Sequence, residues 1–165
     1  MKIIDSFLPE DYFKLSQSLI MDYGFPWQWN DFAVKDIITD DVHDFQFVHP
    51  FYNPLSGVVT NYPRWKDIIK PYADYLNPVS LIRIKANLNV AKSTHIKREF
   101  HTDFKINCTT AIAYMNDNDG FTLFEDGTKV ESKENRVVVF DSNLKHTGIP
   151  CTNQKRRVVI NFNFI

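Results

Sequence analysis

The chain has 165 residues and a formal net charge of −1, and 44% of its residues are apolar. This length favours a single domain over residues 1–165, and the apolar share excludes a disordered chain. Without a long run of Lys or Arg, the near-neutral charge argues against nucleic acid as a partner.

The N-terminal segment, MKIIDSFLPEDY, lacks the apolar run and small-residue cleavage site of a signal peptide. No apolar run in the chain is long enough to cross a bilayer. We therefore expect a cytoplasmic protein without a membrane partner. The sequence indicates no oligomeric state.

Residues 1–77 carry helix signals and are predicted to form a helical support region. One helix is predicted over residues 9–23, and a second begins near Tyr62, with a kink or break at Pro71. The aromatic stretch between them is predicted to be irregular. The expected apolar faces are Tyr12, Leu15, Leu19 and Tyr23 in the first helix and Trp65, Ile68, Ile69, Tyr72 and Leu76 in the second.

From residue 78 to the end, the apolar period changes from helical spacing to two. Short strands separated by turn signals such as Asn118-Asp119-Gly120 indicate a double-sheet barrel. The predicted fold is therefore mainly β, with a jelly-roll (double-stranded β-helix, cupin-like) core over residues 78–165 and helices on one sheet. The predicted strands are a first one from Val79 onward and those at 97–103, 108–116, 121–125, 136–141 and 156–164.

One of the five histidines lies in a His-x-Asp triplet, His101-Thr102-Asp103. On a strand these two side chains share a face, and His146 follows a later apolar strand. Two histidines and one carboxylate form the facial triad of non-haem iron oxygenases, although such a triplet alone is a weak signal. Zinc is an alternative metal for the same ligands, which would imply a hydrolase.

Two arginines open the last strand, ten and eleven residues after His146. An arginine fork beside a metal suits a dicarboxylate. Alternation places Arg157 with Asn161 on a polar face and Arg156 on the apolar face. We therefore predict Arg157 as the carboxylate anchor, with Arg156 as the alternative if a bulge reverses the faces.

The ordered run from His101 to Phe164 resembles the prolyl 4-hydroxylase-like branch of the Fe(II)/2-oxoglutarate dioxygenases. The resemblance is carried by five motifs in order: the His-x-Asp triplet, a tyrosine strand, a Gly-x-Thr-x-Phe segment, a distal histidine and a basic residue about ten positions later. Here these are His101-Thr102-Asp103, Thr110–Asn116, Gly120–Phe124, His146 and Arg156 or Arg157.

The resemblance implies an enzyme with Fe(II), 2-oxoglutarate and dioxygen as cofactor and co-substrates, and His101, Asp103 and His146 as metal ligands. It implies that Tyr114 helps Arg157 to hold 2-oxoglutarate, and that the first barrel strand, with Asn87 and Asn89, contributes to the same pocket. The polar face of the last strand adds Asn161. A carboxylate ligand, where related halogenases have a small residue, implies hydroxylation.

The expected substrate is a peptidyl proline or a small amino-acid-like molecule. Lys97 and Arg98 either meet an anionic substrate or are surface charges, and Trp27 and Trp29 either line a cleft or anchor the core. The alternative to an enzyme is a non-enzymatic cupin-like module that binds a metal or a sugar.

Overall fold

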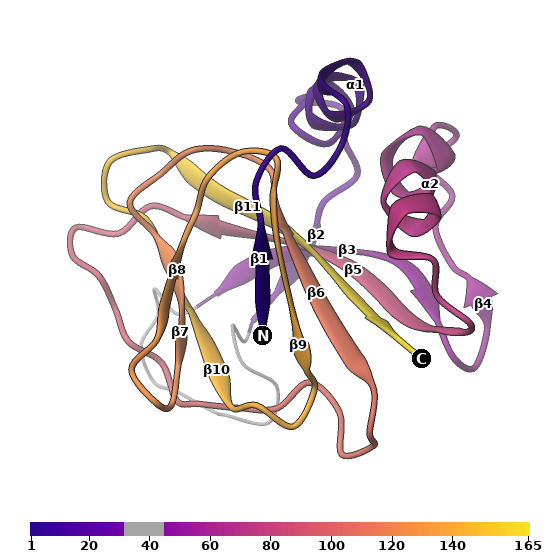
Figure 1. The fold of residues 1–165 in the computed structure, drawn as a ribbon. Helices are drawn as coiled ribbons and strands as arrows, with labels where there is room; N and C mark the ends of the chain where they lie inside the picture. The colour runs from indigo at the N-terminus through magenta and orange to yellow at the C-terminus, as the bar shows by residue number, and fades with distance from the viewer. Residues whose placement is uncertain (32–44) are drawn as a thin grey trace.

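The computed structural model describes residues 1–31 and 45–165. In this part of the chain, two helices and two antiparallel sheets form three layers (Figure 1). The elements are β1 (Lys2–Ile4), α1 (Glu10–Ile20), β2 (Gln28–Asn30), β3 (Gln46–Asn53), β4 (Gly57–Val58), α2 (Trp65–Leu76), β5 (Leu81–Val90), β6 (Thr109–Tyr114), β7 (Phe121–Phe124), β8 (Lys129–Glu131), β9 (Arg136–Asp141), β10 (His146–Ile149) and β11 (Arg156–Phe164).

The large sheet has the strand order β1-β9-β6-β11-β5-β3-β2, with β4 paired to β3. The small sheet has the order β10-β7-β8. From β6 onward the chain crosses repeatedly between the two sheets, with the β7–β8 hairpin and β10 in the small sheet and β6, β9 and β11 in the large one, which is the winding of a jelly roll. The predicted fold class is therefore confirmed.

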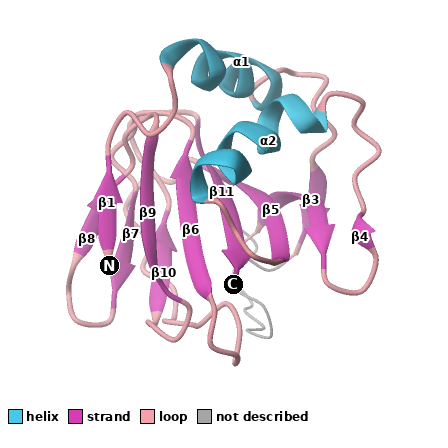
Figure 2. Ribbon diagram, turned by 45° about the vertical axis from the view of Figure 1, so that its right-hand side comes forward, coloured by secondary structure: helices cyan, strands magenta, loops and turns pink. Residues whose placement is uncertain are grey.

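The helices and the small sheet cover opposite sides of the large sheet (Figure 2). On the helix side, alternate residues of β5 and β11 are buried against α1 and α2, as the period of two predicts. A smaller apolar cluster between the two sheets includes Ile112, Phe124 and Val159. The space between the sheets is thus only partly filled with apolar side chains.

Helix α2 matches its predicted face and continues through Pro71 without the expected break. The predicted face of α1 is right for Leu19, which packs against the core, and wrong for Tyr12, Leu15 and Tyr23, which are exposed. The buried face is instead Phe13, Ser16 and Ile20. A serine suits this face because its small side chain allows α1 to approach α2, and its hydroxyl donates to the Ile68 carbonyl at 3.3 Å.

Residues 1–77 contribute four strands in addition to the two predicted helices, and β3 pairs with β5 in the large sheet. Part of the stretch between the helices, residues 32–44, lies outside the described residues. The predicted strand at 97–103 is wrong: only His101 forms a bridge there, and it pairs with His146. Neither helix in the described ranges is long and apolar enough to span a membrane.

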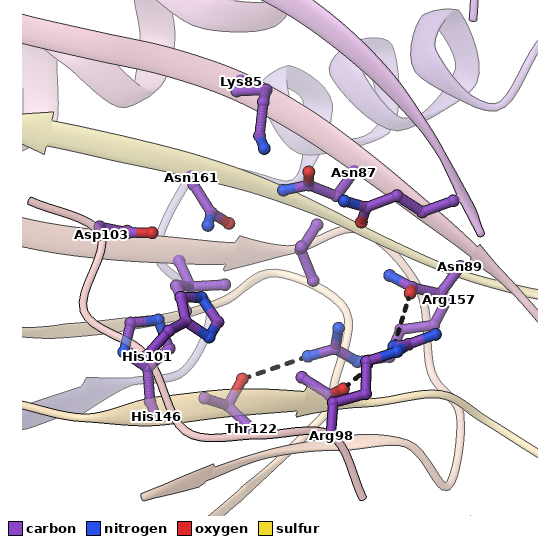
Figure 3. Close-up of a pocket in the computed structure, with 14 residues that line it drawn as sticks. Lys85, Asn87, Asn89, Arg98, His101, Asp103, Thr122, His146, Arg157 and Asn161 are labelled. Carbon is purple, nitrogen blue, oxygen red and sulfur yellow. Dashed lines mark hydrogen bonds between the residues drawn. The ribbon is translucent and has the colours of Figure 1, made fainter. Parts of the chain in front are cut away.

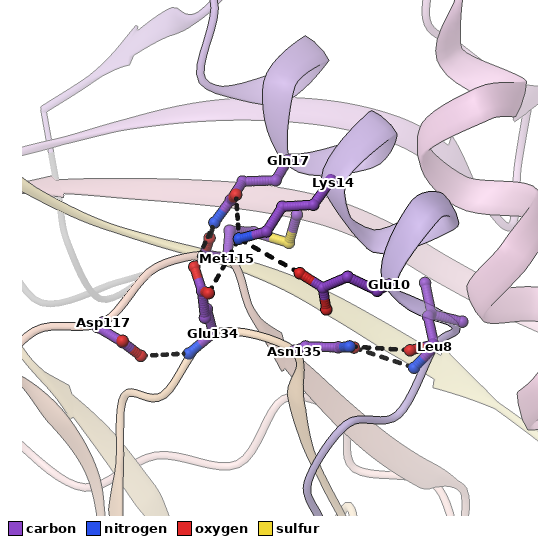
Figure 4. Close-up of polar contacts among 8 residues, drawn as sticks. All are labelled: Leu8, Glu10, Lys14, Gln17, Met115, Asp117, Glu134 and Asn135. Atoms are coloured by element: carbon purple, nitrogen blue, oxygen red, sulfur yellow. Dashed lines mark hydrogen bonds and ion pairs between the residues drawn. The ribbon is translucent and has the colours of Figure 1, made fainter.

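The N-terminal segment is fastened to the turn between β8 and β9 (Figure 4). Asn135, with a positive φ of 57°, accepts a hydrogen bond from the Leu8 amide at 2.9 Å and donates one to the Leu8 carbonyl at 2.8 Å. Next to it, Gln17 of α1 donates to the Met115 carbonyl at 2.6 Å. These contacts hold α1 against the end of the barrel.

Candidate functional site

A pocket opens between the two sheets, on the side of the large sheet that faces away from the helices. Its empty space is about 580 Å³, which includes open solvent at its mouth. Most of its wall is polar (Figure 3). The lining residues come from β3, β5, β6, β7, β10, β11 and the loop before β6, and they include every predicted metal ligand.

His101 and His146 are tied together through their backbones. Each amide donates to the carbonyl of the other residue at 3.0 Å, and the ring centroids are 4.9 Å apart. Nδ1 of His146 donates to the Leu144 carbonyl at 3.0 Å, which leaves Nε2 as the ring nitrogen with a free lone pair. Burial, and then the neighbouring His146, lower the pKa of His101. The lowered pKa suits His101 to be a neutral metal ligand.

Asp103 lies two residues beyond His101, in the loop, and its side chain is 6% exposed. Arg83 pairs with this carboxylate at 3.0 Å, and Nδ2 of Asn163 donates to its other oxygen at 3.0 Å. Burial alone would raise the pKa of Asp103, but the positive charge of Arg83 and the hydrogen bond from Asn163 help to hold it below its ordinary value. The carboxylate is thus oriented and ionised.

One ligand atom from each of His101, Asp103 and His146 lies within 4.8 Å of the others. Two imidazoles and one carboxylate on one side of a point leave the opposite side open, which is the ligand set of non-haem Fe(II) sites. Nδ1 of His101 is buried and has no hydrogen-bond partner in the described ranges. The residues present therefore fit a bound Fe(II) ion, and Arg83 and Asn163 would be its outer-shell partners.

Arg157 lies at the other end of the pocket and is 2% exposed. It donates to Ser132 Oγ at 2.9 Å and to Thr122 Oγ1 at 3.1 Å, and its guanidinium is 5.5 Å from the centre of the Tyr114 ring. Burial lowers its pKa, and no carboxylate of residues 1–31 and 45–165 lies within ion-pairing distance. A buried, unpaired guanidinium is a strong anion-binding group.

The register of β5 and β11 gives the order of side chains along the pocket wall. Arg157 lies opposite Asn89, Val159 opposite Asn87, and Asn161 opposite Lys85. The next pair, Asn163 and Arg83, contacts Asp103. Successive pairs are about 7 Å apart along the strands. The wall thus runs from an anion-binding end at Arg157 to a metal-binding end at Asp103.

The predicted site residues fall on both sides of this sheet. Asn87, Asn89, Asn161 and Arg157 line the pocket, whereas Tyr114 is fully buried behind Arg157 and donates to Thr122 at 2.7 Å. Arg156 points to the other side and donates to the Met21 carbonyl at the end of α1 at 2.7 Å, so it is not in the pocket. Arg156 caps the helix that covers the opposite face.

The two tryptophans that were candidates for a substrate cleft, Trp27 and Trp29, lie outside the pocket wall. Trp27 packs against Phe25 at the edge of the core, with ring centroids 4.9 Å apart. Trp29 is 56% exposed and stacks on Phe45. Of the basic pair before the triad, Lys97 is exposed over Phe100, whereas Arg98 lines the pocket and donates to Asn89 at 3.2 Å.

Several pocket residues were not predicted from the sequence. Thr122 and Ser132 hold the guanidinium of Arg157, and the only signal for Thr122 was its place in the Gly-x-Thr-x-Phe segment. Gly120 leaves room for that guanidinium, since a Cβ there would come within 2.8 Å of both Arg157 Cδ and the Ile149 carbonyl. Lys85 belongs to the polar strand face of Arg83, Lys85, Asn87 and Asn89, which the sequence offers as a candidate pocket wall without a role for the lysine.

No protein-family model and no curated protein matches the chain. Solved structures do match. A prolyl hydroxylase from Trichoplax adhaerens, in complex with a hypoxia-inducible-factor peptide fragment, has a TM-score of 0.65 and 15% identity, over 99% of this chain and 82% of that one. A viral collagen prolyl hydroxylase from Paramecium Bursaria Chlorella virus-1 has a TM-score of 0.58 and 14% identity, over 99% and 96%.

A third matching structure is that of an enzyme with a different activity. The non-haem α-ketoglutarate-dependent epimerase SnoN from nogalamycin biosynthesis has a TM-score of 0.62 and 10% identity, over 99% of this chain and 76% of that one. At these identities the likeness shows the fold. The fold of this chain is thus that of the Fe(II)/2-oxoglutarate oxygenases, with prolyl hydroxylases among them, as the motifs indicated.

Proposed function

We propose that the protein is an Fe(II)- and 2-oxoglutarate-dependent dioxygenase that hydroxylates an unactivated C–H bond and releases succinate and CO2. The observation that carries the proposal is the pairing of two features across one pocket. A two-histidine, one-carboxylate cluster lies at one end, and a buried arginine without a carboxylate partner in the described ranges lies at the other. This pairing occurs in the fold that such oxygenases use.

His101, Asp103 and His146 would hold the iron, which supplies the activation of dioxygen and the oxidation of the substrate. Arg157 would bind the distal carboxylate of 2-oxoglutarate through two charge-assisted hydrogen bonds, with Thr122 and Tyr114 fixing the guanidinium. Asn89, opposite Arg157, and Asn87 would line the remainder of the co-substrate site. The apolar side chains between the sheets restrict water around the reacting groups.

The substrate in this proposal is a peptidyl proline or a small amino-acid-like molecule. Support for a peptide comes from the Trichoplax structure, which holds one. Support for a small molecule comes from the polar lining of the pocket between the two sheets. Both classes present a C–H bond that the metal end of the pocket can receive.

The test is to load purified protein with Fe(II) and 2-oxoglutarate without oxygen and to measure a metal-to-ligand charge-transfer band. Air is then admitted and succinate is measured, beside a His101→Ala variant. We expect the band and succinate from the wild type and neither from the variant. Equal succinate from both proteins would refute the proposal, and iron binding without succinate would favour a metal-binding module.

A further inference from the structure

Lys85 is a cation in the pocket wall that the proposed function does not use. It extends from β5 toward the pocket, beside Asn87 and opposite Asn161 (Figure 3). No carboxylate of the described ranges lies within ion-pairing distance of it, and Asp103 is already paired with Arg83. Lys85 is half-buried, and a cation partly withdrawn from water without a carboxylate beside it favours binding of an anionic ligand.

Loading of the site with iron and 2-oxoglutarate does not neutralise Lys85. Fe(II) adds two positive charges and 2-oxoglutarate adds two negative charges. The distal carboxylate would bind Arg157, whose backbone lies two residue pairs, or about 13 Å, along the strands from that of Lys85. The other carboxylate would bind the metal. The positive charge of Lys85 therefore remains available for a further molecule.

Asn161, the neighbour of Lys85 on β11, has a buried side-chain oxygen without a hydrogen-bond partner in the described part of the chain. An unpaired buried carbonyl oxygen accepts an N–H group. The two side chains together thus offer a positive charge for a carboxylate and an acceptor for an amino group. A peptidyl proline has neither group, because its nitrogen and its carboxyl are both in peptide bonds.

We propose that Lys85 and Asn161 bind the primary substrate, and that this substrate is a small free amino or imino acid. Its carboxylate contacts Lys85 and its amino group donates to Asn161 Oδ1. This inference rests on the proposed function and chooses between the two substrate classes given there. Burial lowers the pKa of Lys85 to about 8, with Arg83 lowering it further and Asp103 opposing them, so the cation still predominates at neutral pH.

The test uses the anaerobic protein with Fe(II) and 2-oxoglutarate, and reads the charge-transfer band without turnover. The proteinogenic amino acids are added one at a time at about 10 mM, an excess that detects millimolar binding. The amide of the best binder and an N-acetylated, C-amidated prolyl peptide are then compared with it. We expect the free acid to perturb the band, and the amide and the peptide to have no effect.

Variants assign the two contacts. Lys85→Met should weaken binding of the free acid by about 30-fold or more, because a charge pair inside the pocket is lost, and should leave 2-oxoglutarate affinity unchanged. Lys85→Arg should retain binding. Asn161→Ala should weaken the binding of the amino acid but not the binding of its desamino analogue. Lys70→Met, on the exposed side of α2, is the matched control.

The outcomes are distinguishable. Absence of the charge-transfer band with iron and 2-oxoglutarate refutes the proposed function itself. A normal band that no amino acid perturbs refutes only the substrate inference. The substrate inference is also refuted if the amide or the capped peptide binds as tightly as the free acid. It is likewise refuted if Lys85→Met weakens the binding of 2-oxoglutarate instead, which would assign Lys85 to the co-substrate.

Discussion

The two faces of the large sheet are made by the same strands but have opposite properties. On the helix face, Ile84 of β5 and Ile160 of β11 pack into the main core. One residue further along each strand, Lys85 and Asn161 point between the sheets and line the pocket. The helix face gains stability from apolar burial, whereas the pocket face holds charged and amide groups that protein atoms only partly satisfy. Substitutions at adjacent residues of one strand should therefore affect either stability or ligand binding, according to the face on which the residue lies.

The largest expected effect is on the metal. His101→Ala removes one of three ligands, so Mn(II) affinity, measured by electron paramagnetic resonance as a probe for Fe(II), should fall by more than about 100-fold, beyond the loss typical of an outer-shell change. His95→Ala is the control, because that histidine is 40% exposed and lies outside the pocket wall. Equal Mn(II) affinity in the wild type and His101→Ala would contradict the assigned centre.

On the helix face, Ile160→Ala should lower the free energy of unfolding by about 2–5 kcal/mol, because it leaves a cavity in the core. Urea denaturation measures the loss. The 2-oxoglutarate affinity of the folded protein should stay within about twofold, since Ile160 does not line the pocket. A large fall in that affinity would show that the two faces are coupled.

On the pocket face, Arg157→Met should have the reverse effect. The affinity for 2-oxoglutarate should fall by about 30- to 100-fold, because a buried charge-assisted pair is lost, while iron binding stays the same. Calorimetric titration measures both. Unfolding free energy should change by only about 1 kcal/mol, since the loss of two hydrogen bonds is offset by removal of a buried charge without a carboxylate partner in the described ranges. An unchanged affinity for 2-oxoglutarate would remove Arg157 from the site.

Asn135→Ala tests whether the hydrogen bonds between Asn135 and Leu8 contribute to stability in the way that the helix face does. The change removes two buried hydrogen bonds to Leu8 and places alanine at a positive φ, which should lower the unfolding free energy by about 2 kcal/mol. Asn143→Ala, in an exposed turn, should have little effect on the same denaturation measurement. A similar loss of unfolding free energy in both variants would mean that the hydrogen bonds between Asn135 and Leu8 are not its cause.

The smallest effect concerns pH. The groups that act on Lys85 are Arg83, which lowers its pKa, and Asp103, which raises it, with burial the largest cause and a pKa of about 8 as the result. Below pH 8 the lysine is charged, and above it the charge is lost. Binding of the free amino acid to metal-free protein should therefore weaken a few-fold between about pH 7 and pH 9. In the Lys85→Arg variant, the affinity for the free amino acid should not change between about pH 7 and pH 9. An equal fall in both proteins would mean that a group other than Lys85 causes the pH dependence.

Most of the β-rich half of the fold could be predicted, because the pattern that indicates a strand lies within the strand itself. The bounds expected for β9 and β11 agree with the structure, since apolar alternation and turn residues lie within the segment itself. Strands β3, β8 and β10 were missed, since β3 contains a proline, β8 has only three residues, and β10 has a glycine and no apolar alternation. The loop that carries His101 was taken for a strand, although its alignment comes from one backbone bridge to His146.

The sequence by itself determined which side chains of β5 and β11 share a face, and the order of the motifs that indicated an oxygenase. The period of two is a property of the extended backbone, so it needs no information from other segments. Only the tertiary structure decided that Arg156 turns to α1, that Arg83 and Asn163 hold Asp103, and that Lys85 lies opposite Asn161. Those relations depend on the register between segments that are far apart in the chain, and no local pattern encodes that register.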